Sequence, residues 1–194
     1  MLHLKLPTDP RWANIAENNI EEILTDHAYC EQKAASTAIS LLITYPEHSD
    51  LVEAMIDLSR EEMAHFKMVY AKIQERGYTL GRERKDDYVN QLRKFIPKGL
   101  DRKKALVYRL LLAALIEARS CERFKVFSEN IKDKELSKFY FDLMKSEANH
   151  FTMFLAFARK YGESIYNVDE LWQEFLDYEA KVISNYGVSE QIHG

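Results

Sequence analysis

Two short segments of the sequence each place a glutamate and a histidine three positions apart. The first holds Glu62 and His65, and the second holds Glu147 and His150. In an α-helix, residues i and i+3 lie on one face, so each pair can direct a carboxylate and an imidazole at the same point. Such oxygen-rich ligation suits iron or manganese better than zinc or copper. The two pairs are therefore candidate parts of a metal site.

Two further glutamates complete a recognisable ligand set. Glu31 and Glu117 each lie in the apolar stripe of a predicted helix, where a carboxylate is costly to bury unless it is paired or binds a metal. Counted from the predicted turns, Glu31 lies level with Glu62, and Glu117 lies level with Glu147. Two Glu-x-x-His helices plus one glutamate from each of two others form the ligand set of di-iron four-helix bundles. The predicted metal ligands are Glu31, Glu62, His65, Glu117, Glu147 and His150.

Glu122 is an alternative to Glu117 on the same predicted helix, because a Cys-Glu dipeptide recurs in both halves of the chain. It lies nearer the turn by about 8 Å at ~1.5 Å per residue, which is too far to share a metal pair with Glu147. It also lies beside Arg119 and Arg123. We therefore choose Glu117 as the ligand and expect Glu122 to form a salt bridge or to support the ligands.

Three other reactive side chains are close in sequence to the predicted ligands. His27 precedes Glu31 by one helical turn, and we interpret it as a core histidine or a support for that ligand. Cys30 and Cys121 belong to no Cys-x-x-Cys pair, so neither a disulfide framework nor a structural zinc site is expected. We expect both to be small buried residues rather than nucleophiles. No residue beyond the six metal ligands is assigned a catalytic or cofactor-binding role.

Long helices must position these ligands, and the composition favours them. Six glycines and four prolines in 194 residues are few, and apolar residues recur at spacings of three and four. This indicates an all-α fold with four bundle helices and an additional C-terminal helix, in a single domain covering residues 1–194. The predicted helices span about residues 15–45, 49–76, 102–129, 133–161 and 168–185.

The connections between the predicted helices give a topology. Short turns make antiparallel hairpins of the first two helices and of the next two. Residues 77–102 are long enough to cross from one end of a bundle to the other, so helices two and three are expected to run parallel. Residues 1–14 are expected to be an extended lead-in, because Pro7 and Pro10 oppose helix. The additional helix is expected to pack on the outside of the bundle.

Charge is unevenly distributed along the chain, although the net charge is only −4. Residues 77–109 contain ten Lys and Arg against four acids, whereas residues 161–194 contain one Lys against seven acids. A solvated surface is the ordinary interpretation of such a run. Beside a buried metal site, however, the basic crossover is a candidate phosphate-contacting surface, with Tyr78, Tyr88 and Phe95 available for stacking on bases.

The sequence shows no sign of export or membrane insertion. The chain does not begin with a basic segment followed by an apolar core. It also contains no apolar run near the ~20 residues that span a bilayer. We therefore expect a cytoplasmic protein with no signal peptide and no membrane partner.

Four segments resemble the tRNA 2-methylthio-isopentenyl-adenosine hydroxylases, and the likeness covers most of the chain from the first to the fourth long helix. These segments are residues 26–35, 60–66, 117–124 and 146–151. The Glu-x-x-His pairs alone are typical of the wider ferritin-like superfamily. The Cys-Glu-Gln-Lys-Ala-Ala and Ala-Arg-Ser-Cys-Glu-Arg-Phe strings indicate this family in particular.

The resemblance implies a ferritin-like four-helix bundle that acts as a non-haem di-iron monooxygenase. Such an enzyme would bind two Fe ions at the six predicted ligands, use O2 as co-substrate and receive electrons from a reductase system. Its substrate would be the isopentenyl group of 2-methylthio-isopentenyl-adenosine next to the anticodon, which makes the tRNA anticodon stem-loop a partner. The alternative is a ferritin-like iron-oxidising or storage protein, or another di-iron oxidase without a nucleic-acid substrate.

Overall fold

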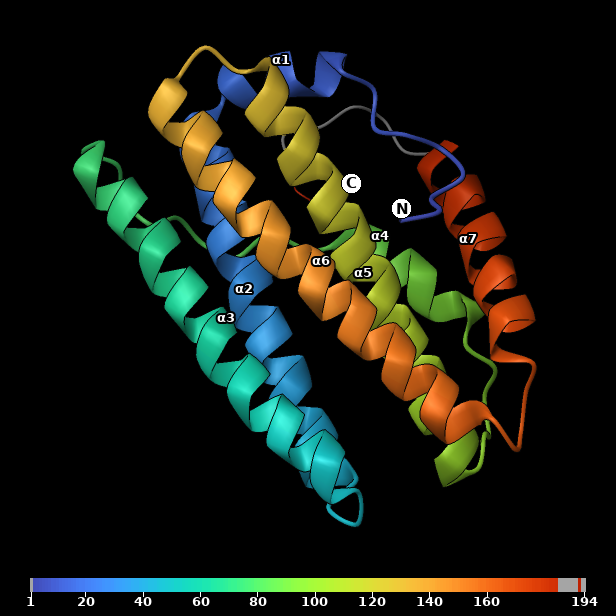
Figure 1. Cartoon of the computed structure of the whole chain (residues 1–194). Coiled ribbons are helices and arrows are strands. Elements are labelled where there is room, and N and C mark those ends of the chain that lie inside the picture. The colour runs from blue at the N-terminus through green and yellow to red at the C-terminus, as the bar shows by residue number, and fades with distance from the viewer. Residues whose placement is uncertain (1, 185–191, 193–194) are drawn as a thin grey trace. The chain divides into compact units, whose positions relative to one another are not determined.

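The computed structural model describes residues 2–184 and 192, and these residues form helices and no strand (Figure 1). By their contacts they divide into two compact units. One unit contains residues 18–85 and 192, and the other contains residues 2–17 and 86–184. No helix among these residues is long and apolar enough to cross a membrane. That the units form a single domain stays a prediction.

An antiparallel helical hairpin makes up most of the smaller unit. Helix α2 (Ile20–Thr44) and helix α3 (Ser49–Glu75) lie side by side and are joined by a short turn. Apolar residues at three- and four-residue spacings form the buried stripe of each helix. The first part of the crossover returns along α2, where the Tyr29 hydroxyl donates to the Gly81 carbonyl at 3.0 Å and Arg84 pairs with Glu22.

A second hairpin forms the centre of the larger unit. It contains α5 (Arg102–Asn130) and α6 (Lys134–Gly162). The Asp101 carboxylate accepts a hydrogen bond from the Lys104 amide at 2.9 Å, and the Asp133 carboxylate accepts two at 3.0 Å. These contacts satisfy amides that a helix start leaves without intrahelical partners.

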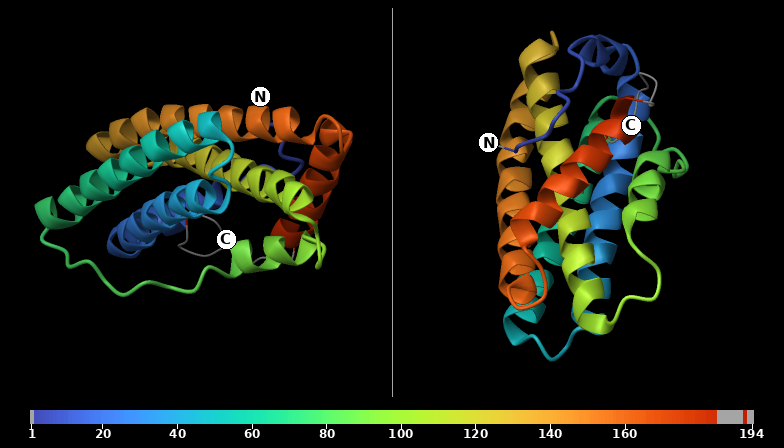
Figure 2. Two further views of the ribbon diagram at one scale, coloured as in Figure 1. Left: turned by 90° about the horizontal axis from the view of Figure 1, so that it is seen from below. Right: turned by 90° about the vertical axis from the view of Figure 1, so that its right-hand side faces the viewer.

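Short helices and α7 cover this second hairpin. Helix α4 (Asp87–Leu92) and the 3-10 turn η1 (Arg93–Phe95) correspond to the amphipathic part of the crossover. Helix α7 (Val168–Ser184) contacts α4, α5 and α6. Figure 2 shows α7 along the outside of the α5–α6 hairpin with α4 beside it. The additional helix therefore lies where the sequence predicts it, as far as Ser184.

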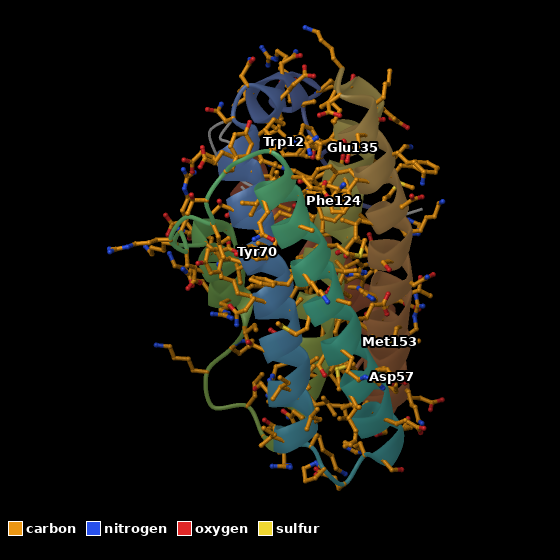
Figure 3. The ribbon with its side chains drawn as sticks, turned by 90° about the vertical axis from the view of Figure 1, so that its left-hand side faces the viewer. Trp12, Asp57, Tyr70, Phe124, Glu135 and Met153 are labelled. Carbon is orange, nitrogen blue, oxygen red and sulfur yellow. The ribbon has the colours of Figure 1, made fainter. Side chains whose placement is uncertain are left out.

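The predicted start of the first long helix at residue 15 and the extended lead-in to residue 14 are wrong, although the helix itself is present as α2. A separate helix, α1 (Arg11–Glu17), begins directly after Pro10, and the chain breaks before α2 starts at Ile20. Proline lacks a backbone N–H, but at the start of a helix this group has no intrahelical partner anyway. A proline can therefore precede a helix as well as end one. The Trp12 ring secures α1, because it lies 5.6 Å from the Phe127 ring and under the Arg123 guanidinium at 4.5 Å. Figure 3 labels Trp12 at the end of the molecule where α1 lies.

A buried polar network joins α5 to α7 and to the N-terminal segment. Arg119 is fully buried and donates to Glu179 at 2.6 Å, to Glu122 at 2.7 Å and to the Leu6 carbonyl at 3.0 Å. Glu122 also accepts from the Thr8 amide at 2.6 Å. A buried guanidinium requires such partners, because an unpaired charge is costly away from water. The network therefore accounts for Glu122 as a salt-bridge residue.

Candidate metal centre

The smaller unit brings together one glutamate from α2 and the first Glu-x-x-His pair from α3. Glu31, Glu62 and His65 each offer a ligand atom within 4.8 Å of the other two. The His65 Nδ1 atom lies 3.2 Å from a Glu62 oxygen and 3.6 Å from a Glu31 oxygen. All three side chains are buried. We call these three residues the first cluster.

His27 contacts the first cluster from the preceding turn of α2. Its Nε2 atom lies 2.6 Å from Glu31 Oε1, and the histidine is fully buried. Burial raises the pKa of Glu31, but hydrogen bonds with His27 and His65 outweigh it and hold that pKa well below its usual range. His27 thus contacts a predicted ligand, and its supporting role stays a prediction. The spacing of four residues between His27 and Glu31 is the sequence feature that predicts this contact.

The carboxylates of the first cluster also shift the pKa of His65. Burial lowers the pKa of His65, but hydrogen bonds with Glu31 and Glu62 outweigh it and raise that pKa to about 10. In the absence of a metal, a proton on His65 therefore offsets part of the negative charge of the two carboxylates. A metal cation would take over this role and displace that proton.

The larger unit holds a second cluster of the same kind. Glu117 on α5 and the pair Glu147 and His150 on α6 each offer a ligand atom within 4.8 Å of the other two. The His150 Nδ1 atom lies 3.9 Å from a Glu147 oxygen and 4.0 Å from a Glu117 oxygen. These three residues, the second cluster, are also buried. The residue that precedes Glu117 by one turn is Ala113, so this cluster has no counterpart of His27 on α5.

The two cysteines differ in their surroundings. Cys121 is buried, and its thiol donates to the Met144 carbonyl at 3.3 Å. Burial, together with Glu117 and Glu122, raises the pKa of Cys121 to about 11, which keeps the thiol protonated and unreactive. Cys30 is half-buried, more exposed than the sequence predicts.

Both clusters fit a metal ion by the chemistry of their donors. Each supplies two carboxylates and one imidazole on rigid helices, at spacings that one ion could bridge. Carboxylates buried so close together repel each other, and a cation between them removes this cost. In each hairpin the 3.6-residue period of the helices places the candidate ligands on the buried face.

A comparison with models of protein families shows which family the chain belongs to. The family model described as tRNA-(MS[2]IO[6]A)-hydroxylase (MiaE) matches residues 1–194, the whole chain. The chain belongs to the MiaE family. Membership in a family of hydroxylases places it among the oxidoreductases, and the resemblance seen in the sequence is confirmed.

Two curated relatives carry the same name, tRNA 2-(methylsulfanyl)-N(6)-isopentenyladenosine(37) hydroxylase. The protein from Pseudomonas putida is 41% identical over 160 residues, covering 82% of this chain and 77% of the relative. The protein from Salmonella typhimurium is 28% identical over 206 residues, covering 81% of this chain and 75% of the relative.

A solved structure supports the fold of this MiaE-family chain. It is described as protein 43 with aldehyde deformylating oxygenase activity from Synechococcus. It matches with a TM-score of 0.88 and 32% identity, covering 98% of this chain and 95% of the other. The predicted all-α, ferritin-like fold class is therefore confirmed.

The MiaE-family structure corrects the predicted stacking surface of the crossover. Tyr88 is buried, and its hydroxyl donates to Glu179 at 3.1 Å. The Phe95 ring packs against Phe175 and Tyr178. The Tyr88 ring is therefore not available to stack on a base. Phe95 packs on α7 but is only half-buried, so its stacking role stays a prediction, as does that of Tyr78. The sequence did not reveal these contacts, because the partners of both rings lie on α7, far along the chain.

Proposed function

We propose that this chain is an O2-dependent non-haem di-iron monooxygenase that acts on tRNA in the cytoplasm. Its substrate would be 2-methylthio-isopentenyl-adenosine beside the anticodon, hydroxylated on the isopentenyl group. The observation that carries this proposal is a pair of buried Glu, Glu-x-x-His clusters in a chain of the MiaE family. The names of the two relatives supply the substrate.

The proposal includes a single centre built from both clusters. Three ligands are too few to hold two ions, whereas the two clusters together supply four carboxylates and two histidines, the set used by di-iron bundles. The proposed ligands of the two Fe ions are Glu31, Glu62, His65, Glu117, Glu147 and His150. A family member with only one functional cluster would lack half of this set.

When bound, the iron would supply the redox chemistry, in which O2, two electrons from a reductase and two protons convert a C–H bond to C–OH and release one water. The protein residues have other tasks. The carboxylates and histidines hold the metal ions on rigid helices, and burial keeps bulk water away from the oxidant. His27 orients the Glu31 carboxylate through its 2.6 Å contact. The protonated Cys121 thiol avoids competing for metal.

Nucleoside analysis of tRNA tests this function directly. Cells that make 2-methylthio-isopentenyl-adenosine but lack this protein should accumulate that nucleoside, and expression of the protein should convert it to the hydroxylated form. Expression of the Glu147→Ala variant should not, because the centre would lose a ligand. The variant should keep its helical circular dichroism while its iron content falls. Full conversion by Glu147→Ala would contradict the ligand assignment.

A second candidate follows from the likeness to the Synechococcus structure, whose protein is described as having aldehyde deformylating oxygenase activity. A di-iron oxidase acting on a small apolar substrate would contain the same clusters. Purified, iron-loaded protein should be assayed with a fatty aldehyde and with undermodified tRNA side by side. Turnover of the aldehyde with unchanged tRNA would favour this alternative, and a mineral iron core would favour storage.

A further inference from the structure

Cations gather on one exposed segment of the larger unit. Residues 93–104 contain six Lys or Arg and a single acid, Asp101. Five of the six cations are exposed, and together they define what we call the basic surface. They are Arg93, Lys94, Lys98, Arg102 and Lys103. In Figure 1 this segment leads from α4 to the first turn of α5.

Aromatic packing fixes this segment to α7. The centroid of the Phe95 ring lies 4.8 Å from that of Phe175 and 5.0 Å from that of Tyr178. The Tyr178 hydroxyl donates to the Gln91 carbonyl at 3.3 Å. The backbone that carries the cations is therefore held against α7 by aromatic packing, with the buried Phe175 and the half-buried Phe95 and Tyr178 in contact. A partner would meet a preformed surface and would not have to order a loose loop.

The first turn of α5 carries cations, whereas the first turn of a helix usually favours acidic residues. Arg102, Lys103 and Lys104 lie in its first turn, which contains no acid. Cations there are destabilising, because they lie at the positive end of the helix dipole. Helices α6 and α7 both have acids in their first turns. A departure from local preference is expected at a functional surface rather than at one that only needs to be solvated.

We propose that the basic surface binds the phosphate backbone of the tRNA substrate. This proposal rests on the proposed function, because an enzyme that modifies a nucleoside within tRNA must hold a polyanion. Lys and Arg side chains gain affinity for nucleic acid by releasing the counterions of the phosphates. Two other arginines fit this role less well, since Arg84 pairs with Glu22 and Arg159 pairs with Asp169 at 2.8 Å.

The acidic face of α7 limits where the RNA can lie. Its exposed acids include Glu170 and Glu174, while the exposed Asp169 and Asp177 pair with Arg159 and Lys5. Like charges repel, so a phosphate backbone would run over the basic surface and avoid this face. The larger unit thus has cations on the crossover side and acids on α7, and this separation of charge would orient a bound RNA.

The proposal is tested with a charge reversal and a matched control. Lys103→Glu replaces an exposed cation in the first turn of α5, and Lys134→Glu makes the same change in the first turn of α6. Because α5 and α6 are antiparallel, these sites lie at opposite ends of a hairpin about 40 Å long at ~1.5 Å per residue. A triple variant, Arg93→Gln, Lys94→Gln and Lys98→Gln, tests the rest of the basic surface.

The measurements are binding of an anticodon stem-loop RNA at several salt concentrations, iron content and melting temperature. We expect Lys103→Glu to bind roughly tenfold more weakly at low salt, and the triple variant to lose about two from the slope of log K against log salt. Both should keep their iron. Lys103→Glu should melt no lower than the parent, because the helix dipole favours an acid there. Lys134→Glu should bind as the parent does.

Three outcomes would overturn the assignment of this surface. Unchanged affinity and salt slope in Lys103→Glu and the triple variant, with a parent protein that hydroxylates tRNA, would show that the RNA binds elsewhere while the proposed function stands. Equal weakening by Lys103→Glu and Lys134→Glu would show an effect of net charge alone. A parent protein that neither binds nor modifies tRNA would overturn the proposed function, and this surface with it.

Discussion

At the scale of single residues, two glutamates on α5 lie close together in sequence but have different surroundings. Glu117 lies in the second cluster with Glu147 and His150. Glu122 instead accepts hydrogen bonds from Arg119 and from the N-terminal segment. One carboxylate thus has the surroundings of a metal ligand and the other those of a structural ion pair. The difference can be measured, because the two roles affect different properties.

Alanine at each of these positions should separate the two roles. Glu117→Ala should lower iron content and activity, while the metal-free variant should be at least as stable as the parent because a buried carboxylate is removed. Glu122→Ala should keep its iron but lose about 1–3 kcal/mol of stability, since the buried Arg119 loses a partner. Metal analysis and urea unfolding measure the two effects. The reverse pattern would show that Glu122 is the ligand.

The raised pKa of His65 in the first cluster predicts how the stability of the metal-free protein depends on pH. The pKa of His65 is raised to about 10 from 6.5, so the folded state favours the protonated form. This contribution is fully present below pH 6.5 and is lost as the pH rises towards 10. Urea unfolding of the metal-free protein at pH 6 and at pH 9 should show it. The His65→Gln variant serves as control, and an equal decline in that variant would contradict the assignment to His65.

His27 should affect the metal without being a ligand. Its contact with Glu31 would be kept in part by His27→Gln and lost in His27→Ala. We expect metal affinity to fall from the parent to His27→Gln and again to His27→Ala. The alanine variant should lose on the order of tenfold or more in affinity. Competition with a metal-binding dye measures this without an activity assay. Equal affinity in all three proteins would show that His27 only fills the core.

At the scale of elements, two helical hairpins carry the proposed ligands, and their ends are defined by caps and close contacts. Asp101 and Asp133 accept hydrogen bonds from the first turns of α5 and α6. Gly162 ends α6 shortly before α7 begins at Val168, and a Cβ atom at Gly162 would collide with a methyl carbon of Val168. The position of α7 therefore depends on a residue without a side chain.

Gly162→Ala should destabilise the larger unit although alanine favours helix. The added methyl group would force Val168 to move, and overpacking of this kind typically costs about 1–3 kcal/mol. Urea unfolding measures the loss. The double variant Gly162→Ala with Val168→Ala should recover part of it, because the contacted methyl group is gone. A stability equal to that of the parent would show that α7 adjusts freely.

At the scale of the whole molecule, the metal site would link segments that lie far apart in the chain. Each cluster is complete within one hairpin, whereas the proposed six-ligand centre requires both. A metal that binds only the folded chain stabilises it by an amount set by its concentration and affinity, about 2.7 kcal/mol at a hundredfold excess over Kd. Removing the metal should therefore affect the stability of the entire protein.

Metal removal should lower the melting temperature, and loss of either cluster should have the same effect. We expect ferrous iron or manganese to raise the melting temperature of the parent, but to raise it little in Glu62→Ala or in Glu147→Ala. Differential scanning calorimetry under anaerobic conditions measures this. If each single variant kept about half of the shift, the clusters would bind metal independently, and the single centre would be wrong.

The sequence by itself determined the long helices, the hairpins, the spacing of the proposed ligands and the likeness to the family. These features depend on residues three or four positions apart, and helical periodicity reports such relations directly. The choice of Glu117 over Glu122 also followed from counting along helices. Composition and periodicity alone did not give the substrate, which came from the resemblance and from the names of the relatives.

Only the tertiary structure decided which residues meet across the chain. The partners of Arg119 lie 60 residues away at Glu179 and 113 residues away at Leu6, and no local pattern predicts such contacts. The same holds for Tyr88, which is buried with its hydroxyl on Glu179, and for the contact of the Phe95 ring with Phe175 of α7. Helix α1 likewise forms where its Trp12 can be buried against α5, because burial of apolar surface outweighs weak local preferences.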